Sequence, residues 1–427
     1  MLHIEEGIYG LDKELIDVRS PDVAEESQER APATVMNRKL VLIMAAACAA
    51  SVANLYYIQP LLANMGREFA VSANQMGIIA TMSQVGYACG LLFIIPLGDK
   101  YNQRKLIVGM LIAVTLALIV MASAPSILLV GVASFLVGVT TVVPQLIIPY
   151  SASLAPVKAR GQVVGTVMSG LLIGILLART VSGLVAAHFG WRAMYWIAAI
   201  MMILLAVLMR VLLPDDRAQK GSMSYPQLLR SLWGLVRDEP VLRETMFFGA
   251  LAFAAFSVFW VALSFFLATP PYHFGSEVAG LFGLVGVAGA LAASFVGKFA
   301  DRRDPRLANG MGLVIILVSF VIMWLTGQWL FGLIVGTILL DLGTQSNQIS
   351  SQARVYSLQP EARNRLNTVY MFVYFIGGSL GSILGTVGWS MAQWNGVCAV
   401  ACLLILIALA FYVLNTRSMR QHLRSVR

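Results

Sequence analysis

Long apolar runs alternate with short polar breaks along most of this 427-residue chain. Many runs reach the roughly 18 residues that a helix needs to cross the hydrocarbon core of a bilayer. Because lipid offers no hydrogen bonds to the backbone, each run is expected to form a helix. The pattern predicts an all-α membrane protein with twelve spanning helices, at residues 40–63, 73–98, 106–122, 126–150, 161–188, 191–213, 244–268, 277–299, 308–326, 329–352, 365–389 and 394–415.

Composition points to the same class. Hydrophobic residues make up 58% of the chain and charged residues 12%, whereas soluble domains carry about 25% charged residues. So few charges could not cover the surface of a soluble protein of this length. The first 37 residues are polar and acidic, and they lack the apolar segment of a cleavable signal peptide, so a disordered or loosely helical tail is expected there.

Basic residues mark one side of the membrane. With the polar tail set aside, the even-numbered loops and both chain ends hold nearly all of the lysines and arginines, while the odd-numbered loops hold only Arg67 and Arg192. The positive-inside rule therefore predicts that both termini are cytoplasmic. This topology accounts for the net charge of +9, and because the basic residues are spread over separate loops, nucleic acid is not an expected partner.

No constellation of catalytic or metal-binding residues is visible. The four cysteines lie in apolar runs, and Cys398 and Cys402 have no histidine or acid beside them, so neither a metal nor a cofactor is expected. No nucleophile–base pair and no phosphate-binding glycine loop is seen, which argues against an enzyme and against an ATP-driven pump. A non-transporting membrane receptor or sensor is an alternative class, but the short loops leave no room for a folded signalling domain.

Two stretches of the chain repeat at nearly the same offset. PLGDKYNQRK, with Asp99, and GKFADRRDPR, with Asp301, are 202 residues apart, and a second pair, at Pro156 and Pro360, is 204 apart. The repeat predicts two six-helix halves in tandem. The predicted division is an N-terminal tail, a first bundle, a linker, a second bundle and a C-terminal tail, at 1–37, 38–213, 214–243, 244–415 and 416–427.

The predicted linker holds one helical pattern. Ser224 is a candidate N-cap, Pro226 suits the first turn, and leucines recur at helical spacing after it. We expect a short helix that lies on the membrane surface.

With this repeat, the sequence resembles the major facilitator superfamily. The loop motif G-x-x-x-D-R-x-x-x-R is complete in the second half, and the first half has Ile95 in place of the leading glycine. The resemblance implies two six-helix bundles, transport of a small molecule, and motif residues that hold the halves together on the cytoplasmic side. These residues are Asp99, Lys100, Arg104 and Lys105 in the first half and Gly297, Asp301, Arg302 and Arg306 in the second.

Within the superfamily the chain resembles the drug:proton antiporter branch, especially bacterial arabinose-efflux-permease-like exporters. Span 5 follows the signature G-x8-G-x3-G-P-x2-G-G at Gly165, Gly174 and Gly183, and its small residues permit close helix packing, with a glycine stripe on span 8 as a candidate partner. Ala178 and Ser182 replace signature glycines but stay small, and two further positions depart more strongly from the branch. Arg179 replaces the signature proline, and Ser134 stands where many proton-coupled members have an arginine.

Arg179 and Asp341 are the only ionisable residues deep in the predicted spans. A charge at the bilayer centre costs about 3 kcal/mol on insertion scales, so each should face the bundle interior or water. We expect both to take part in proton coupling, with Asp341 either carrying the proton or binding a cationic group of the solute. Asp341 begins a polar stripe on span 10, and the resemblance implies that spans 1, 4, 7 and 10 line a central cavity. The candidate cavity residues are Asn54, Tyr56, Tyr57, Gln59, Gln145, Ser257, Trp260, Gln345, Asn347 and Gln348. The alternative is that these polar groups only bond neighbouring helices.

The expected function is secondary transport: export of a small organic molecule, such as a drug, sugar or metabolite, across the bacterial inner membrane by proton antiport. The halves would rock about a central site. The expected partners are the solute, protons and the lipid bilayer, and the chain is expected to be a monomer. The main alternative is a proton-coupled importer or a uniporter of a sugar-like or nucleoside-like solute.

Overall fold

The computed structural model describes residues 37–156, 159–214, 224–300, 305–359 and 362–425, with side chains placed in all of these except 99, 290–300 and 416–425. Every regular element in these ranges is helical, which confirms the predicted all-α membrane fold. The elements that correspond to the predicted spans are α2 Arg38–Ala53, η1 Gln59–Leu61 and α3 Leu62–Glu68 for span 1; α4 Ala73–Phe93 and η2 Ile95–Asp99 for span 2; α5 Gln103–Ser123; α6 Ile127–Thr140 and α7 Val143–Leu154 for span 4; α8 Arg160–Phe189; α9 Trp191–Leu212; α11 Pro240–Leu267; α12 Ser276–Ala300; α13 Pro305–Thr326; α14 Leu330–Leu358; and α15 Arg363–Ser425 for spans 11 and 12.

Three predicted spans are not the continuous helices that the apolar runs suggested, and a proline lies just after each break. Pro60, Pro96 and Pro144 each occupy the first turn of the segment that follows. Proline lacks the N–H of the helix ladder and clashes with the preceding turn, so it suits a first turn but interrupts a helix interior. The break in span 1 leaves residues 54–58 outside regular helix, between α2 and η1.

The last two predicted spans lie on one element, α15, with a sharp interruption. Ala392 (φ −147°, ψ 26°) and Gln393 (φ 48°, ψ −133°) leave helical geometry, so the backbone divides there into two helices. The interruption falls between the predicted spans 365–389 and 394–415, where a loop was expected.

The helix predicted in the linker is α10, Tyr225–Asp238. The Ser224 backbone N–H donates to Gln227 Oε1 at 2.9 Å, which satisfies one donor at the start of the helix. Trp233 is 73% exposed on one face, while the opposite face packs toward α11 and α15 through Leu228, Leu232 and Leu235.

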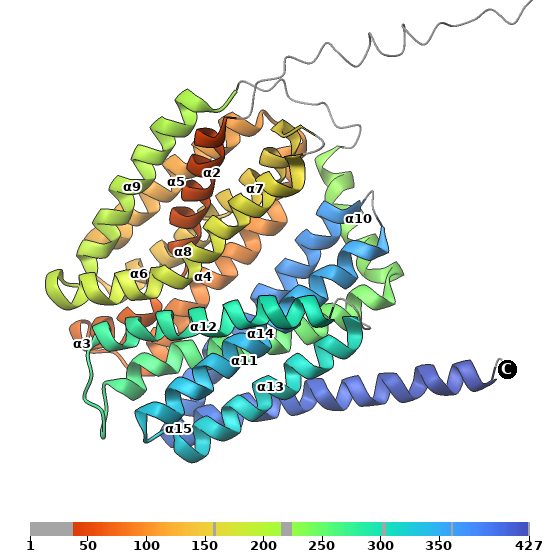
Figure 1. Cartoon of the computed structure of the whole chain (residues 1–427). Helices are drawn as coiled ribbons and strands as arrows, with labels where there is room; N and C mark the ends of the chain where they lie inside the picture. The colour runs from red at the N-terminus through yellow and green to blue at the C-terminus, as the bar shows by residue number, and fades with distance from the viewer. Residues whose placement is uncertain (1–36, 157–158, 215–223, 301–304, 360–361, 426–427) are drawn as a thin grey trace, which may run out of the picture.

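The helices pack in two groups, which we call the first bundle (α2–α9) and the second bundle (α11–α15). Figure 1 shows the first bundle in red to yellow-green and the second in green to blue. Two seams join the bundles: α8 packs against α12, and α4 packs against α15. The seams therefore place residues of α8 and α4 beside helices of the other bundle.

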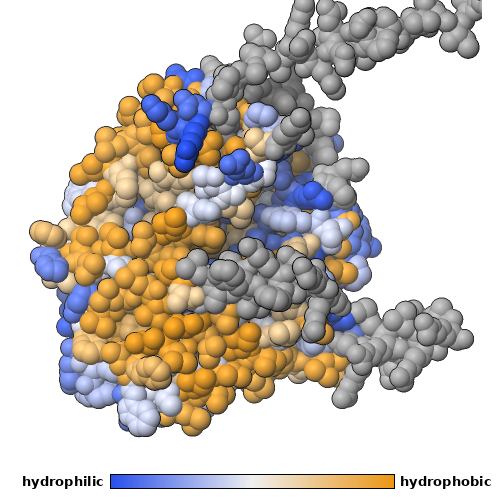
Figure 2. All heavy atoms as spheres, in the orientation of Figure 1, coloured by the Kyte–Doolittle hydropathy of each residue, from blue (hydrophilic) through white to orange (hydrophobic). Residues whose placement is uncertain are grey.

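The outer surface is strongly apolar. Figure 2 shows a broad hydrophobic area, and large apolar side chains such as Leu128, Leu204 and Phe331 are exposed. Such a surface is costly in water and is expected where lipid tails are the solvent.

Judged by length and composition alone, eight stretches of the described chain can cross a bilayer. One of them, 363–415, holds the last two predicted spans. α14 is absent from this set because Asp341 and its polar neighbours lower the hydropathy of that helix. α2 is absent because it ends at Ala53, ahead of the break in span 1.

Candidate functional site

Arg179 lies on α8 beside the seam with α12, and only 1% of the residue is exposed. Its Nε donates to Gln59 Oε1 at 2.6 Å, and Nη1 donates weakly to the Ile175 carbonyl at 3.4 Å. Nη2 is buried and has no hydrogen-bond partner among the residues the structure describes. A fully buried guanidinium with an unpartnered NH2 group is unusual, because such groups normally find partners.

Three aromatic rings surround this guanidinium. Its Cζ lies 3.9 Å from the ring centre of Trp260, 4.8 Å from that of Tyr56 and 5.6 Å from that of Phe256. Cation–π contacts of this kind are worth about 2 kcal/mol when desolvated. Trp260 and Phe256 lie on α11 of the second bundle, so two of the three aromatic contacts of Arg179 cross between the bundles.

The break in span 1 positions the first-bundle partners of Arg179. Tyr56 lies in the non-helical stretch after α2, and Gln59 begins η1, so both side chains come from chain that has left the α-helix. The sequence proposed Tyr56, Gln59 and Trp260 as cavity residues, and the structure brings them together around Arg179. Phe256 was missed, because a phenylalanine in an apolar helix gives no signal of its own.

Asp341 lies on α14 and is 3% exposed. It packs against a glycine face of α12: a Cβ added at Gly286 would lie 3.0 Å from Asp341 Oδ2, and one at Gly289 would lie 2.9 Å from its Cβ. Oδ2 is buried without a hydrogen-bond partner in the described chain. Glycine is therefore needed on α12 so that the carboxylate has space.

The same α12 face also accommodates Arg179. A Cβ at Gly283 would lie 3.0 Å from Arg179 Cβ, so the arginine and the aspartate pack one helical turn apart on α12. The two charges are near enough to interact electrostatically. They do not form an ion pair, since no N···O distance of 4.0 Å or less joins them among the described side chains.

The polar stripe that follows Asp341 divides among different neighbours. Tyr374 OH donates to Gln348 Oε1 at 3.4 Å toward α15, whereas Asn347 Nδ2 donates to the Asn309 carbonyl at 3.5 Å toward α13. Gln345 is half-buried. Asn347 therefore bonds a neighbouring helix, and Gln348 does the same on the other side of α14.

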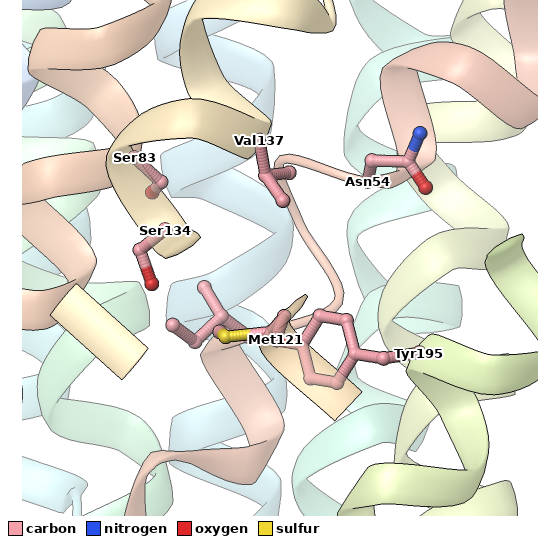
Figure 3. Close-up of a pocket in the computed structure, with 7 residues that line it drawn as sticks. Asn54, Ser83, Met121, Ser134, Val137 and Tyr195 are labelled. Atoms are coloured by element: carbon pink, nitrogen blue, oxygen red, sulfur yellow. The ribbon is translucent and has the colours of Figure 1, made fainter. Parts of the chain in front are cut away.

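Asn54 and Ser134 line a small cavity of about 10 Å³ inside the first bundle (Figure 3). Ser83, Met121 and Tyr195 also line it. Asn54 Oδ1 and Ser134 Oγ are buried without a partner in the described residues. One water molecule could fit in a space of this size and bond such groups.

The remaining predicted cavity residues make no hydrogen bond to Arg179 in the described chain. Gln145 Nε2 donates to Tyr87 OH at 3.4 Å in the first bundle. Tyr57 is buried in the first-bundle core at 3% exposure. Ser257 is buried on α11, and its Oγ has no partner within the described chain.

Arg306, the last residue of the second loop motif, belongs to a buried charge cluster. Glu244 Oε1 accepts from Arg306 Nη2 at 2.7 Å and from Asn415 Nδ2 at 3.0 Å, and Glu244 Oε2 accepts from Arg354 Nη2 at 2.6 Å. All four residues lie in the second bundle. Glu244 was not among the predicted site residues. The signal that could have identified it is an acidic residue next to Arg243 at the start of the apolar run of span 7.

The other motif residues are only partly described. Asp301 and Arg302 lie outside the described residues, and the surroundings of Asp99 and Gly297 are not described. Arg104 donates to the Arg210 carbonyl within the first bundle, and Lys100 and Lys105 are exposed.

The small residues of α8 pack differently from the prediction. A Cβ at Gly170 or Gly174 would collide with the backbone at Ala45 or Ala49 of α2, so this part of the stripe meets its own bundle. The glycines of α12 instead meet α8 near Leu176 and Thr180 and at Gly183. The expectation that the two stripes face each other is wrong at Gly170 and Gly174, because helical spacing identifies a face but not its neighbour.

Among the residues that the structure describes, the hydrogen bonds between the bundles lie toward one end of the molecule. They link Asn64 to Ser276, Asn74 to Ser390, Thr81 to the Ser379 carbonyl, Gln84 to Ser382, Thr180 to the Gly280 carbonyl, and Ser276 to the Gly183 carbonyl, at 2.9–3.3 Å. This is the end at which α4 and α12 begin and α8 finishes. It is the end that the charge pattern predicts to face outward.

Two helical bundles in a membrane fold, with buried charges beside their seam, are the architecture of a secondary transporter. The chain belongs to the Major Facilitator Superfamily, whose family model matches residues 42–382.

Named relatives are transporters. The chain is 40% identical over 370 residues to the "Putative uncharacterized transporter YgaY" of Escherichia coli K12, which covers 87% of this chain and 94% of the relative. It is 31% identical over 383 residues to the "Probable transporter SCO4007" of Streptomyces coelicolor, with 90% and 89% covered. A bacterial homolog of the human lysosomal transporter Spinster, in an inward-facing and unoccupied conformation, shares the fold with a TM-score of 0.73 and 15% identity, with 90% and 98% covered.

Proposed function

We propose that this superfamily transporter exports a small organic molecule across the bacterial inner membrane in exchange for protons. A site between the two bundles opens to each side in turn. Arg179 and Asp341 are the coupling residues, and the aromatic residues around Arg179 belong to the solute site.

The observation that carries this proposal is that two buried charged side chains each have a polar atom without a hydrogen-bond partner in the described chain. Arg179 Nη2 and Asp341 Oδ2 are both buried without a hydrogen-bond partner in the described chain, although their residues interact electrostatically. A charge retained in a membrane span at such cost marks a solute, ion or proton pathway more often than a packing role. A purely structural pair would be expected to close into a direct ion pair with its hydrogen bonds satisfied.

The hydrogen bonds between the bundles support a state closed at the predicted outer end. We propose that both termini are cytoplasmic and that the structure represents an inward-facing conformation. In this state Arg179 of the first bundle is held by Trp260 and Phe256 of the second, so the aromatic contacts help to keep the outer end closed. Opening outward requires that these contacts separate.

Protonation of Asp341 is the proposed coupling step. An ionised carboxylate in a dry site is stabilised by a nearby cation and is costly without one. Movement of α8 relative to α14 changes the distance from Arg179 to Asp341, and with it the free energy of the ionised carboxylate. Proton uptake and release at Asp341 are thereby tied to the separation of the bundles.

The loop motif is proposed to act at the cytoplasmic end. The Glu244 cluster bonds Arg306, and so the end of the second motif loop, to α11, α14 and α15. We propose that this anchor holds the loop in place for contacts of the remaining motif residues with the other bundle.

The test is transport by purified protein in liposomes with an imposed pH gradient. Labelled arabinose, uridine, phenylalanine and ethidium are supplied one at a time, and both uptake and efflux are followed. Asp341→Asn should abolish accumulation driven by the gradient while exchange of labelled for unlabelled solute persists. Asp238→Asn, the same change at an exposed position of α10, should behave as wild type. Gradient-driven accumulation at the wild-type level in Asp341→Asn would overturn the proposal.

A further inference from the structure

The buried atoms that lack partners around Arg179 and Asp341 make opposite chemical demands. Arg179 Nη2 and Trp260 Nε1 are donors, and Asp341 Oδ2 is an acceptor. Their residues are 1%, 2% and 3% exposed, so water does not satisfy them in this state. Leaving such groups unpaired is costly, and a ligand that pairs them gains that free energy on binding.

The two charges are held apart by their surroundings. The Arg179 guanidinium is drawn to Gln59 and stacked on Trp260, whereas the Asp341 carboxylate packs on Gly286. Opposite charges in a membrane interior normally pair with one another. Here they remain separate, so the site offers a fixed positive group and a fixed negative group within electrostatic range of each other.

This arrangement selects among solute classes by charge. An anionic solute would be attracted by Arg179 and repelled by Asp341. A cationic solute would be attracted by Asp341 and repelled by Arg179. A neutral polyol could hydrogen-bond both groups but would neutralise neither charge. A solute with both charges is complementary to both groups.

We propose that the solute is a small zwitterion with an apolar side chain, of the kind represented by an amino acid such as phenylalanine. Its carboxylate accepts from Arg179 Nη2 and Trp260 Nε1, its ammonium donates to Asp341 Oδ2, and its side chain packs against the rings of Tyr56 and Phe256. This rests on the proposed function, because the solute reaches these buried atoms only when the bundles separate.

The assignment has a consequence for coupling. The solute ammonium and a proton compete for the same carboxylate, since protonated Asp341 has no charge to offer an ammonium. Solute and proton then occupy the site in turn, which is the condition for exchange.

The test is equilibrium binding to the purified protein in detergent, without any gradient. Four probes carry both charges, one charge or neither: phenylalanine has both, its methyl ester has only the ammonium, N-acetyl-phenylalanine has only the carboxylate, and N-acetyl-phenylalanine methyl ester has neither. Arabinose serves as the polyol. Phenylalanine should bind at least tenfold more tightly than each of the others, since a hydrogen bond to a charged group is worth about tenfold or more in affinity. Equal binding of the four, tighter binding of arabinose, or no binding of phenylalanine would overturn the proposal.

Variants assign each charge to its residue. Asp341→Asn should weaken phenylalanine binding about tenfold while binding of N-acetyl-phenylalanine is retained or improved. Trp260→Phe keeps an aromatic ring on α11 beside Arg179 and removes the indole N–H together with part of the ring, so it should weaken the binding of phenylalanine and of N-acetyl-phenylalanine alike. Asp238→Asn is the matched control, and an unchanged Tm shows that each variant is folded. Loss of both ligands in Asp341→Asn would contradict the assignment of the ammonium to Asp341.

The binding and transport experiments distinguish a failure of the zwitterion proposal from a failure of the proton-exchange proposal. If phenylalanine binds with this charge preference but is not moved by a pH gradient, the site assignment stands and proton exchange is wrong. If arabinose is moved by the gradient and phenylalanine does not bind, proton exchange stands and the zwitterion is wrong.

Discussion

Glu244 and Asp341 are both buried acids near arginines, but their surroundings differ. Glu244 is bonded by Arg306, Arg354 and Asn415, so both of its oxygens have partners. Asp341 has a free Oδ2 and no direct ion pair in the described chain, although Arg179 is within electrostatic range. We propose that the satisfied cluster holds its helices in place, whereas the unsatisfied pair binds a proton or solute.

The largest expected effect is at Glu244. Glu244→Gln removes the carboxylate charge that Arg306 and Arg354 share, and the side chains of these two arginines are each 10% exposed. Removing one member of a buried ion pair costs about 3–5 kcal/mol. The purified variant should therefore show a much lower Tm and reduced yield, while Asp341→Asn should not. Equal losses of Tm in the two variants would contradict the proposed difference between the Glu244 cluster and the Arg179–Asp341 pair.

A smaller effect is expected where α12 meets Asp341. Gly286→Ala places a methyl group 3.0 Å from Asp341 Oδ2, so the carboxylate must shift. Overpacking of this kind costs about 1–3 kcal/mol. Gly165→Ala is the matched control on α8, since a Cβ there meets nothing within 4 Å. Gradient-driven transport and Tm should fall in the first variant only; wild-type transport by Gly286→Ala would show that the position of the carboxylate is not critical.

The smallest effect is expected at the pair of Glu68 with Arg192, whose side chains are 42% and 34% exposed. Partial burial acts to raise the pKa of Glu68, but hydrogen bonds from Arg192 and Trp191 and the charge of Arg192 outweigh it and hold that pKa below its ordinary value. A lowered folded-state pKa contributes stability above the ordinary carboxylate pKa, and this contribution is lost as pH falls through the folded-state value.

Glu68→Gln should therefore lower stability by less than about 1 kcal/mol at neutral pH, because exposed ion pairs are weak. The difference in Tm from wild type should shrink in acid and at high salt. A difference that stays constant from neutral pH to pH below about 4 would rule out the ion pair as its cause.

The apolar runs were sufficient to predict the fold, but not every helix in it. Run length in lipid determines where helices cross, so each predicted span has a counterpart in the structure. The helix breaks at Pro60, Pro96 and Pro144 were not predicted, because the apolar run continues through each of them while the helix is interrupted. α14 runs to Leu358, beyond its predicted end, because a helix can continue past the apolar stretch into polar surroundings.

The site was predictable where a residue type is out of place. Arg179 and Asp341 are conspicuous in apolar spans, and polar or amphipathic residues nearby include Tyr56, Gln59 and Trp260. Spacing could not reveal that Asn347 bonds α13, since a helical stripe does not identify its neighbours. The role of Gly286 depends on how closely α12 approaches α14, which is a property of packing alone.

The central claim is that Arg179 and Asp341 act in coupling and are not a fixed structural pair. Its most direct test compares Arg179→Ala, Asp341→Asn and the double variant for folded abundance in membranes and for gradient-driven transport. We expect near-normal abundance for Asp341→Asn and no proton-driven accumulation in the single or the double variants. Low abundance in both single variants, with abundance and coupled transport both restored in the double variant, would contradict the account.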